Sequence, residues 1–161
     1  MLLPLLSLWQ CFIFQLTGHL VQKIADNLAY CLARAHRRFT SRLSTELKPL
    51  GLTVDMWAVL GALAEMPGLP MTQIAAHLSH NLPTVTKLID RMVSDNLVYR
   101  KEHHSDRRRV LIFPTERGLE LYHEAAAIAG DLEARLLGSS KISGPELQAL
   151  LQRLSNQELL S

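Results

Sequence analysis

Apolar residues recur three and four positions apart along most of the chain, and short runs rich in Pro, Gly, Asn or Ser interrupt them. This spacing places apolar side chains on one face of an α-helix, so each uninterrupted run predicts an amphipathic helix. Pro and Gly disfavour continuation and mark the ends of the runs. The pattern predicts one long helix and three shorter ones, over residues of about 22–47, 53–66, 71–78 and 82–95.

The helix predicted over 82–95 has clear signals at both ends. Asn81 can cap its first turn through the side-chain oxygen, and Pro83 suits that turn because its missing N–H costs little there. Asn96 tolerates the left-handed conformation that is common where a helix ends. The buried face is predicted to carry Val85, Leu88, Ile89, Met92 and Val93.

A basic hairpin is predicted directly after this helix. Residues 97–99 and 109–113 are rich in β-branched and aromatic side chains and indicate two strands, joined by more than a two-residue turn. Residues 100–109 hold five Arg or Lys against two Asp or Glu. Such a cluster is often only a solvated loop. Beside a helix with a polar outer face it indicates duplex DNA, since the helix offers side chains to base edges and the hairpin offers cations to phosphates.

Two further helices are predicted toward the C-terminus. Thr115 can cap the first, and Ser143 with Glu146 forms a capping-box pattern at the start of the second. Apolar residues are expected to run along the first of them at Leu119, Tyr122, Ala126, Leu132 and Leu136. These two helices and the long first one carry more apolar side chain than one small core can cover. They either fold back on that core or pair with a second copy of the chain.

Several spaced motifs around the hairpin agree with one another. The run at 88–93 is followed by Leu97-Val98, by Asp106-Arg107-Arg108 and by Thr115-Glu116-Arg117-Gly118. Asp-x-Arg, six further residues, then Thr and, three positions on, Gly is the wing signature of the multiple-antibiotic-resistance regulator (MarR) family. The chain resembles this family over about residues 20–160. Three positions depart from the family pattern, namely Pro70, Asn96 and Pro114.

The resemblance implies a mostly α-helical fold with a small β wing, the winged helix-turn-helix, with N- and C-terminal dimerisation helices. It implies a single domain over 19–161, with a DNA-binding lobe at about 53–114 and dimerisation helices at about 19–47 and 115–160. It also implies a transcriptional regulator, commonly a repressor, that binds double-stranded DNA as a homodimer. Two-fold symmetry in the protein implies a pseudo-palindromic operator.

Two groups of residues are expected to contact DNA. The first turns of the helix at 82–95 are expected to meet base edges through Leu82, Pro83, Thr84, Thr86 and Lys87. Thr methyls can touch a thymine methyl and Lys can donate to guanine, although the two Thr also fit an ordinary helix surface. By resemblance, Arg108 enters the minor groove, held by Asp106, and Arg107 contacts phosphates. Arg91 has two alternatives, a phosphate contact or an ion pair with Asp106.

Members of the family commonly respond to small phenolic or other amphipathic molecules, and the resemblance implies such an effector. His36, Phe39 and Trp57 are candidates to contact it, although Phe39 and Trp57 fit the core equally well. One branch of the family senses oxidants through a cysteine of the first helix. Cys31 lies in that helix but not at that branch's position, so a buried structural cysteine is the simpler expectation. Two alternatives to a ligand-responsive repressor stay open: a redox-sensing regulator that uses Cys31, and a winged-helix protein-interaction module without DNA binding.

Composition changes this picture little. With 161 residues the chain is long enough to bury a core as one domain, and its net charge is only +2. Two cysteines make no secreted disulfide framework and fit a reducing cytoplasm. No metal-ligand spacing, phosphate-binding glycine loop or nucleophile constellation stands out. We therefore expect no metal, no cofactor and no enzymatic activity.

Residues 1–18 are apolar and carry no charged side chain. The run is shorter than the roughly 20 residues of a membrane span and lacks the basic start of a secretory signal. We expect an apolar N-terminal extension, either packed on the dimer or read from an unnatural upstream start, and no membrane partner. A membrane anchor is the alternative.

Overall fold

The computed structural model describes residues 27–102, 110–138 and 142–155. The chain divides into two compact units, residues 1–42 and 43–161. Helix α2 (Leu28–Leu47) begins in the first unit and ends in the second. Just before this helix, the Asn27 side chain accepts a hydrogen bond from the Tyr30 N–H at 3.2 Å. The long first helix is confirmed over these residues, and the expected extension at 1–18 lies outside them.

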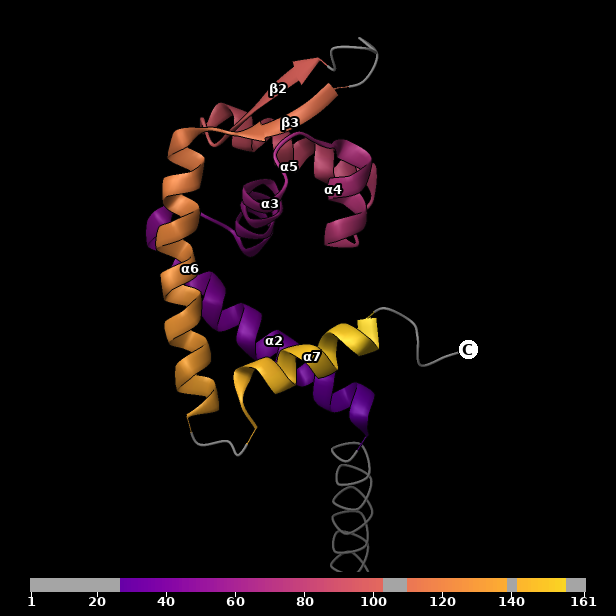
Figure 1. The fold of residues 1–161 in the computed structure, drawn as a ribbon, viewed down its shortest axis with the longest axis vertical. Coiled ribbons are helices and arrows are strands. Elements are labelled where there is room, and N and C mark those ends of the chain that lie inside the picture. Colours follow the sequence, from indigo (N-terminus) through magenta and orange to yellow (C-terminus); the bar gives the residue numbers. More distant parts are fainter. Residues whose placement is uncertain (1–26, 103–109, 139–141, 156–161) are drawn as a thin grey trace, which may run out of the picture. The chain divides into compact units, whose positions relative to one another are not determined.

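The remaining helices and strands belong to the second unit (Figure 1). They are the 3-10 helix η1 (Lys48–Leu50), α3 (Val54–Glu65), β1 (Leu69–Pro70), α4 (Met71–Leu78), α5 (Leu82–Ser94), β2 (Val98–Glu102), β3 (Val110–Pro114), α6 (Glu116–Leu137) and α7 (Gly144–Ser155). The mostly helical fold with a small wing, as expected for a winged helix-turn-helix, is confirmed.

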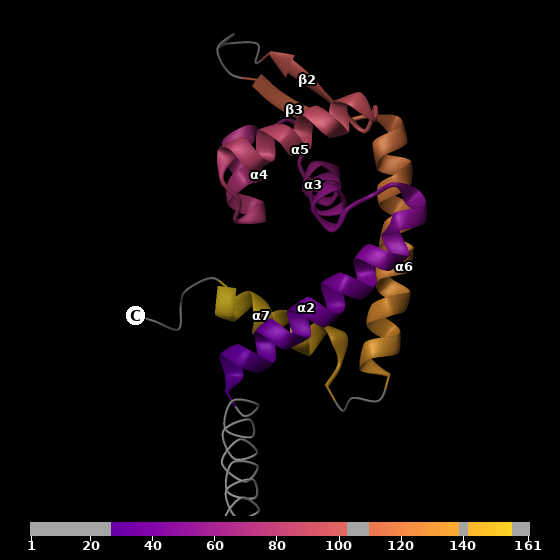
Figure 2. The same ribbon diagram turned by 180° about the vertical axis from the view of Figure 1, so that it is seen from behind.

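The core of the second unit lies between α3, α4, α5 and the sheet. Helix α3 packs against α4, α6 and β3, and α5 packs against α4 and β2. In both ribbon views α4 and α5 lie side by side beneath the β2–β3 hairpin (Figures 1 and 2). The largest fully buried side chains are Leu43, Leu47, Met56, Val59, Leu60, Leu63, Ile74, Val85, Ile89, Met92, Val98 and Ile112. Burial of this size supplies the main free-energy gain of folding.

The wing is part of a three-stranded antiparallel sheet with the order β1-β3-β2. Strand β2 pairs with β3 from Val98↔Pro114 to Glu102↔Val110. Strand β1 holds two residues and was not predicted, because so short a segment has no periodicity to detect. Gly68 makes this third strand possible: its φ is +90°, and a Cβ there would lie 2.8 Å from the Phe113 ring. The Gly68 N–H donates to the Ile112 carbonyl at 3.1 Å.

Left-handed residues end three of the helical segments. Asn96 follows α5 with φ of 55°, as its side chain predicted. The Leu97 N–H then donates to the Met92 carbonyl at 2.8 Å, which gives a hydrogen-bond partner to one of the free carbonyls at the end of the helix. Ser79 and Gly51 have the same conformation after α4 and η1, with φ of 53° and 71°. Asn96 therefore takes the left-handed conformation after α5 that its residue type predicted.

One expectation about a buried face was wrong in detail. Val93 is 38% exposed because it lies at the edge of the α5 stripe, whereas Val85, Ile89 and Met92 form its centre. On α6 the buried positions are Gly118, Ala125, Ala129 and Leu132, whereas Leu136 is 58% exposed, which agrees with the expectation that this helix carries more apolar side chain than one core can cover. The first turn of α6 is fixed against Leu97, and this contact sets which face of the helix turns inward.

Within the described ranges, no individual helix combines the length and the apolar character that a membrane span needs. The segments 28–50 and 54–65 satisfy that requirement only when taken together, as a bent pair judged by length and composition.

Candidate DNA-binding surface

Helix α5 presents its first turns to solvent. The Asn81 side chain accepts a hydrogen bond from the Thr84 N–H at 2.9 Å, and Pro83 occupies the first turn, so both predicted signals are confirmed. The five residues expected to meet base edges are all exposed, namely Leu82, Pro83, Thr84, Thr86 and Lys87. Val85 and Ile89 are fully buried on the opposite face. This division leaves an outward surface that is held rigidly by the core behind it.

The chemistry of the outward surface is mixed. The Thr86 hydroxyl donates to the Leu82 carbonyl at 2.9 Å, so its methyl group and oxygen lone pairs are what it can offer a ligand. Leu82 is 46% exposed and adds a second apolar contact. Among the described residues Lys87 makes no ion pair, so its ammonium can serve an outside acceptor. Methyl groups and one cation suit the edges of thymine and guanine.

The turn before α5 is tied to α3. His80 lies 3.3 Å from Asp55, measured from Nε2 to Oδ2, and both side chains are partly exposed. The Thr53 side chain caps α3 by accepting from the Met56 N–H at 3.2 Å, which places Asp55 in the first turn. Helix α5 is the second helix of the helix-turn-helix pair. The turn that leads into it is held in place by the contact between His80 and Asp55 of α3.

An ion pair joins α5 to the wing. Arg100 on β2 donates from Nη2 to Oδ1 of Asp90 on α5 at 2.6 Å. Sequence reasoning did not predict this contact. The signal that could have found it is the alternation along β2, which places Arg100 on the same side as the buried Val98. The pair fixes the root of the hairpin relative to α5, and as a partly exposed pair it adds little to stability.

Arg91 pairs with a residue that sequence reasoning did not consider. Its Nε lies 3.6 Å from Oδ2 of Asp95, one helical turn further on, and its side chain is 63% exposed. The other expected wing residues, Asp106, Arg107 and Arg108, lie outside the described residues. Their predicted contacts, including the alternative pair between Arg91 and Asp106, stay predictions.

The end of α5 is locked to the start of α6. The Thr115 hydroxyl donates to the Asn96 carbonyl at 2.8 Å and accepts from the Gly118 N–H at 3.0 Å. The Thr115 N–H donates to the Leu97 carbonyl at 3.0 Å. A Cβ at Gly118 would overlap the Leu97 carbonyl oxygen. The Thr-x-x-Gly motif therefore has a physical reason: threonine caps α6, and glycine lets two backbones approach.

The residues considered for an effector are placed separately in the two units. His36 is exposed and Phe39 half-buried on α2. Trp57 is half-buried on α3, and its Nε1 is a buried donor that finds no hydrogen-bond partner among the described residues. Cys31 is exposed, so the expectation of a buried structural cysteine was wrong. Within the described ranges no group of His, Cys, Asp or Glu could hold a metal ion.

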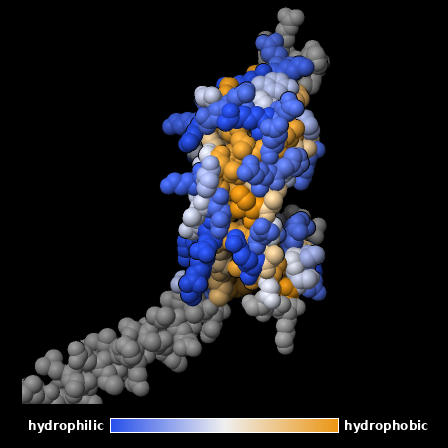
Figure 3. Space-filling view, turned by 90° about the vertical axis from the view of Figure 1, so that its left-hand side faces the viewer, coloured by the Kyte–Doolittle hydropathy of each residue, from blue (hydrophilic) through white to orange (hydrophobic). Residues whose placement is uncertain are grey.

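The C-terminal end of the second unit leaves apolar side chains uncovered. Helix α7 buries none of its residues, and its start is fixed by Glu146, which accepts from the N–H of Ser143 at 2.9 Å and from its hydroxyl at 2.7 Å. Both hydrogen bonds lower the pKa of Glu146, and the bond from the Ser143 hydroxyl has the larger effect. The exposed apolar residues of this end are Leu136, Ile142, Leu150, Leu151 and Leu154. Figure 3, which faces the left-hand side of Figure 1, shows apolar side chains gathered in a strip.

The chain matches known regulators. Residues 52–110 match the MarR family. The HTH-type transcriptional repressor IacR of Pseudomonas putida is 33% identical over 66% of this chain and 64% of its own length, so the chain spans just under two thirds of that relative. The organic hydroperoxide resistance transcriptional regulator of Bacillus subtilis (strain 168) is 31% identical over 82% of this chain and 87% of its own length.

Solved structures agree with the sequence matches. The repressor CouR, bound to a 23-mer DNA duplex, superimposes with a TM-score of 0.72 at 27% identity, over 83% of this chain and 94% of that one. The apo form of MarR from E. coli shows the same fold, with a TM-score of 0.67 at 23% identity over 84% and 98% of the two chains. A capped α5 beside a three-stranded wing, matched in sequence and in fold by these regulators, places the chain in the MarR family of transcriptional regulators.

Proposed function

We propose that this chain is a sequence-specific regulator that binds double-stranded DNA as a homodimer and represses transcription from a pseudo-palindromic operator. One observation carries the proposal: the first turns of α5 present one exposed face, are capped at Asn81 and are backed by the buried Val85 and Ile89. The DNA-bound CouR repressor shares this fold and supports the assignment. The relatives are named regulators, which supports a role as a regulator rather than an enzyme, acting in the cytoplasm.

Direct base readout falls to the outward face of α5. Leu82, Pro83, Thr84, Thr86 and Lys87 are the proposed base-edge residues, since each is exposed. Lys87 would donate to guanine, and the methyl groups would pack on thymine methyls. Arg91 is proposed to contact a phosphate, because its pair with Asp95 is long and well exposed and so costs little to exchange.

The wing tip supplies the remaining cations. Arg108 is proposed to enter the minor groove with Asp106 orienting it, and Arg107 to contact phosphates. The ion pair between Arg100 and Asp90 supports this role, since it holds the root of the wing against α5 at 2.6 Å. Helix and wing would then reach adjacent parts of one duplex as a single body.

Dimerisation falls to the helices outside the DNA-binding lobe. We propose the lobe at about 53–114 and the dimerisation helices at about 19–47 and 115–160. The support is the set of leucines on α7 that the chain itself leaves 39–51% exposed, Leu150, Leu151 and Leu154. A two-fold dimer would present two α5 helices to successive major grooves roughly 34–36 Å apart.

The regulator is proposed to respond to a small amphipathic or phenolic effector. His36, Phe39 and Trp57 are the proposed contacts. The support is the Trp57 indole N–H, a buried donor with no acceptor in the described part of the chain. An effector with a hydroxyl or carboxylate could satisfy it.

A second candidate is a redox-sensing regulator that uses Cys31. The exposure of Cys31 favours it, since a sensing thiol must be reached by oxidant. The test is operator binding before and after mild peroxide treatment: loss of binding in the wild type but not in Cys31→Ser supports the redox mechanism. An equal response in both proteins contradicts it.

Selection of bound fragments from random and genomic DNA tests the proposed function. The full-length protein should enrich a motif of two inverted half-sites about 10 base pairs apart. A winged-helix module that serves protein partners would enrich none. Absence of any enriched motif, or a motif without two-fold symmetry, would contradict the proposal.

A salt titration of operator binding tests the wing. Arg108→Ala should weaken binding and flatten the logarithmic salt dependence by up to about 0.9, the slope for one neutralised phosphate. Arg135→Ala is the matched control, because Arg135 lies on α6 and pairs with Glu46 at 3.4 Å. Unchanged affinity and slope in Arg108→Ala would remove the wing from the interface.

A further inference from the structure

Helix α2 concentrates positive charge on one face. The helix is continuous over its 20 residues (Figure 2) and holds four arginines and one glutamate, a formal charge of +3 (4 − 1). The whole chain carries only +2, so the residues outside α2 sum to −1 (2 − 3). The excess positive charge of the protein therefore comes from this helix. Its four arginines are all exposed, namely Arg34, Arg37, Arg38 and Arg42.

The four arginines form a stripe along the helix. Arg34, Arg38 and Arg42 are four residues apart, and each such step turns the side chain by only about 40°, because one helical turn takes about 3.6 residues. Arg37 lies three residues after Arg34 and borders the same face. At about 1.5 Å per residue, the stripe from Arg34 to Arg42 is about 12 Å long. We call these four residues the α2 arginine stripe.

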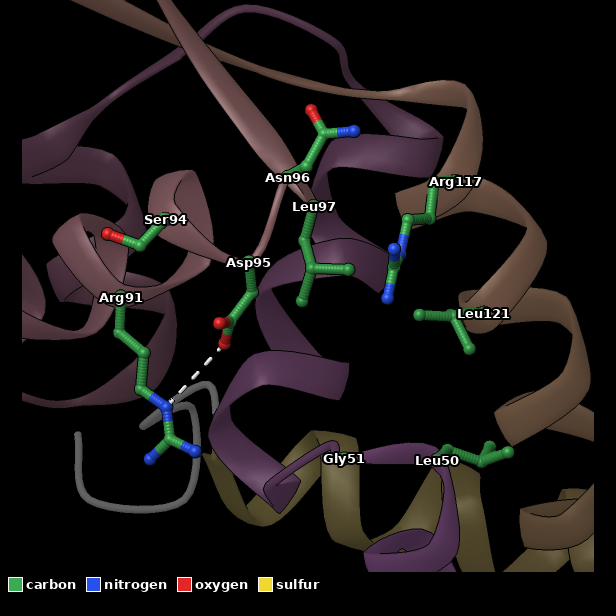
Figure 4. A pocket seen from close by; sticks show the side chains of 9 residues that line it. All are labelled: Leu50, Gly51, Arg91, Ser94, Asp95, Asn96, Leu97, Arg117 and Leu121. Carbon is green, nitrogen blue, oxygen red and sulfur yellow. Dashed lines mark ion pairs between the residues drawn. The ribbon is translucent and has the colours of Figure 1, made fainter.

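The stripe has no carboxylate to neutralise it in the described part of the chain. Glu46, the one acid of α2, pairs with Arg135 of α6 at 3.4 Å. Arg91 of α5 shows the contrast, since Asp95 lies one turn away and pairs with it at 3.6 Å (Figure 4). None of the ion pairs between described residues involves an arginine of the stripe. Its guanidinium groups are therefore available to an anion outside the chain.

The apolar face of α2 lies on another side of the helix. Phe39, Leu43 and Leu47 each follow an arginine of the stripe by five residues, which turns them away from it by about 140°. Leu43 and Leu47 are buried, and Phe39 is half-buried. The stripe can therefore stay exposed when the apolar face packs on the core or in the proposed dimer. A helix that binds a membrane inserts its apolar face into the lipid, and the buried leucines are not free to do so.

A row of guanidinium groups suits a chain of phosphates. Each guanidinium stays charged and donates paired N–H groups that match the oxygens of a phosphate. Duplex DNA carries one charge per about 1.7 Å of its axis, so about seven phosphates fall within the roughly 12 Å of the stripe. DNA is also the polyanion that the proposed function brings to this protein. A duplex therefore matches the stripe in the sign and in the spacing of its charge.

We propose that the α2 arginine stripe binds the phosphate backbone of double-stranded DNA outside the operator, as a second contact that is independent of sequence. The inference rests on the proposed function, in which α5 and the wing hold the operator. A two-fold dimer would carry two such stripes. The backbone can belong to the flanks of the operator or to a second duplex that the dimer bridges, since both present the same phosphates.

Operator duplexes of two lengths test the contact with the flanks. One contains the selected operator alone, and the other adds about three helical turns of unrelated sequence on each side. The full-length wild type should bind the longer duplex at least about fivefold more tightly at about 50 mM salt. Arg34→Gln with Arg38→Gln should remove this gain and flatten the logarithmic salt dependence on the longer duplex by up to about 1.8 per stripe, about 0.9 for each phosphate.

Three controls accompany this pair of substitutions. Binding of the operator alone should stay within about twofold of the wild type, which also shows that the variant folds, since glutamine is a good helix former. Arg34→Lys with Arg38→Lys keeps the charge and should keep most of the gain. Arg135→Gln with Arg153→Gln removes the same charge from exposed positions of α6 and α7 and should keep all of it.

A bead assay tests the contact with a second duplex. With a duplex that lacks the operator fixed on the beads, the wild type should retain a labelled operator duplex, and Arg34→Gln with Arg38→Gln should not. A gain on the longer duplex assigns the contact to the flanks, and retention on the beads assigns it to a second molecule. Either result, lost in the double variant, supports the proposal.

Three outcomes would overturn the proposal. Absence of both effects in the wild type, or equal effects in the wild type and in the double glutamine variant, would remove the stripe from DNA and leave operator binding by α5 and the wing intact. Arginine-dependent binding to vesicles of phosphatidylglycerol and phosphatidylcholine, without either DNA effect, would assign the stripe to a membrane surface. A wild type that does not bind the operator alone would remove the proposed function, and this inference with it.

Discussion

The DNA-binding lobe and the C-terminal helix α7 differ in how far they bury their apolar side chains. In the lobe, α5 buries Val85, Ile89 and Met92 completely and exposes mainly polar residues. Helix α7 buries no residue, and its leucines at 150, 151 and 154 are 39–51% exposed. The lobe thus satisfies its hydrophobic pattern within one chain, whereas α7, although it contacts α6, leaves its leucines partly exposed.

We propose from this difference that the two regions have different tasks. A region whose core is complete can hold a surface rigid for an outside ligand, and the outward face of α5 has that property. A helix with an uncovered apolar stripe gains free energy only when a partner buries it. We therefore interpret the lobe as the part that reads DNA and α7 as part of the dimer interface.

The largest effect is expected from the centre of the lobe. Ile89→Ala should lower the free energy of unfolding by about 2–5 kcal/mol, because it opens a cavity in a closely packed core. Val93→Ala on the same helix is the matched control and should cost less than about 1 kcal/mol, since Val93 is 38% exposed. Urea unfolding measures both. Similar losses in the two variants would show that α5 is not anchored as described.

The α7 stripe should affect association rather than folding. Replacing Leu150, Leu151 and Leu154 together with serine should weaken the dimer by about 3 kcal/mol, roughly a hundredfold in dissociation constant. Replacing the exposed Gln148 and Gln152 with serine is the control. Analytical ultracentrifugation over a range of protein concentrations gives the dissociation constant. A triple variant that remains as strongly dimeric as the wild type would place the interface elsewhere.

Two glycines of α6 lie in different surroundings, one close to a neighbouring backbone and one in open space. Gly118→Ala should cost about 1–3 kcal/mol, because the added Cβ overlaps the Leu97 carbonyl and two backbones must move apart. Gly130→Ala has open space around it and should gain up to about 1 kcal/mol from improved helix propensity. Thermal unfolding of both variants measures the contrast. A Gly118→Ala protein as stable as the wild type would contradict the close approach of Leu97 and α6.

The smallest effect concerns the cap of α7. The Ser143 bonds lower the pKa of Glu146, so the cap contributes above the unfolded pKa of this carboxyl and is lost as pH falls through the lowered folded value. Carbon-detected NMR titration should find Glu146 ionised at a pH below its ordinary range, and Ser143→Ala should raise its pKa. Gln148→Ala should leave it unchanged. If Ser143→Ala left the pKa of Glu146 unchanged, that result would mean that the capping box does not form.

Sequence patterns predicted the features whose cause is local. Asn81, Thr115 and the Ser143–Glu146 pair cap helices through contacts three residues away, so the signal and its effect lie in the same short segment. Helix periodicity placed α3, α4 and α5 for the same reason.

Features that depend on distant segments could not be predicted in this way. The Arg100–Asp90 pair requires β2 to return across α5, and β1 exists only because β3 offers it a partner. The buried face of α6 follows from the backbone contact at Gly118, which periodicity does not contain. The exposure of Cys31 also depends on what surrounds α2 rather than on its own spacing.

The proposal that α5 reads base edges has one direct test, the ratio of affinities for a selected operator and for scrambled DNA. The double variant Thr84→Ala and Lys87→Ala should lower this ratio at least about tenfold, since each good base contact is worth about 1–3 kcal/mol. Lys101→Ala, which removes an exposed cation from β2, should weaken binding to both DNAs alike and leave the ratio unchanged. A double variant that keeps the wild-type ratio would show that specificity comes from another surface.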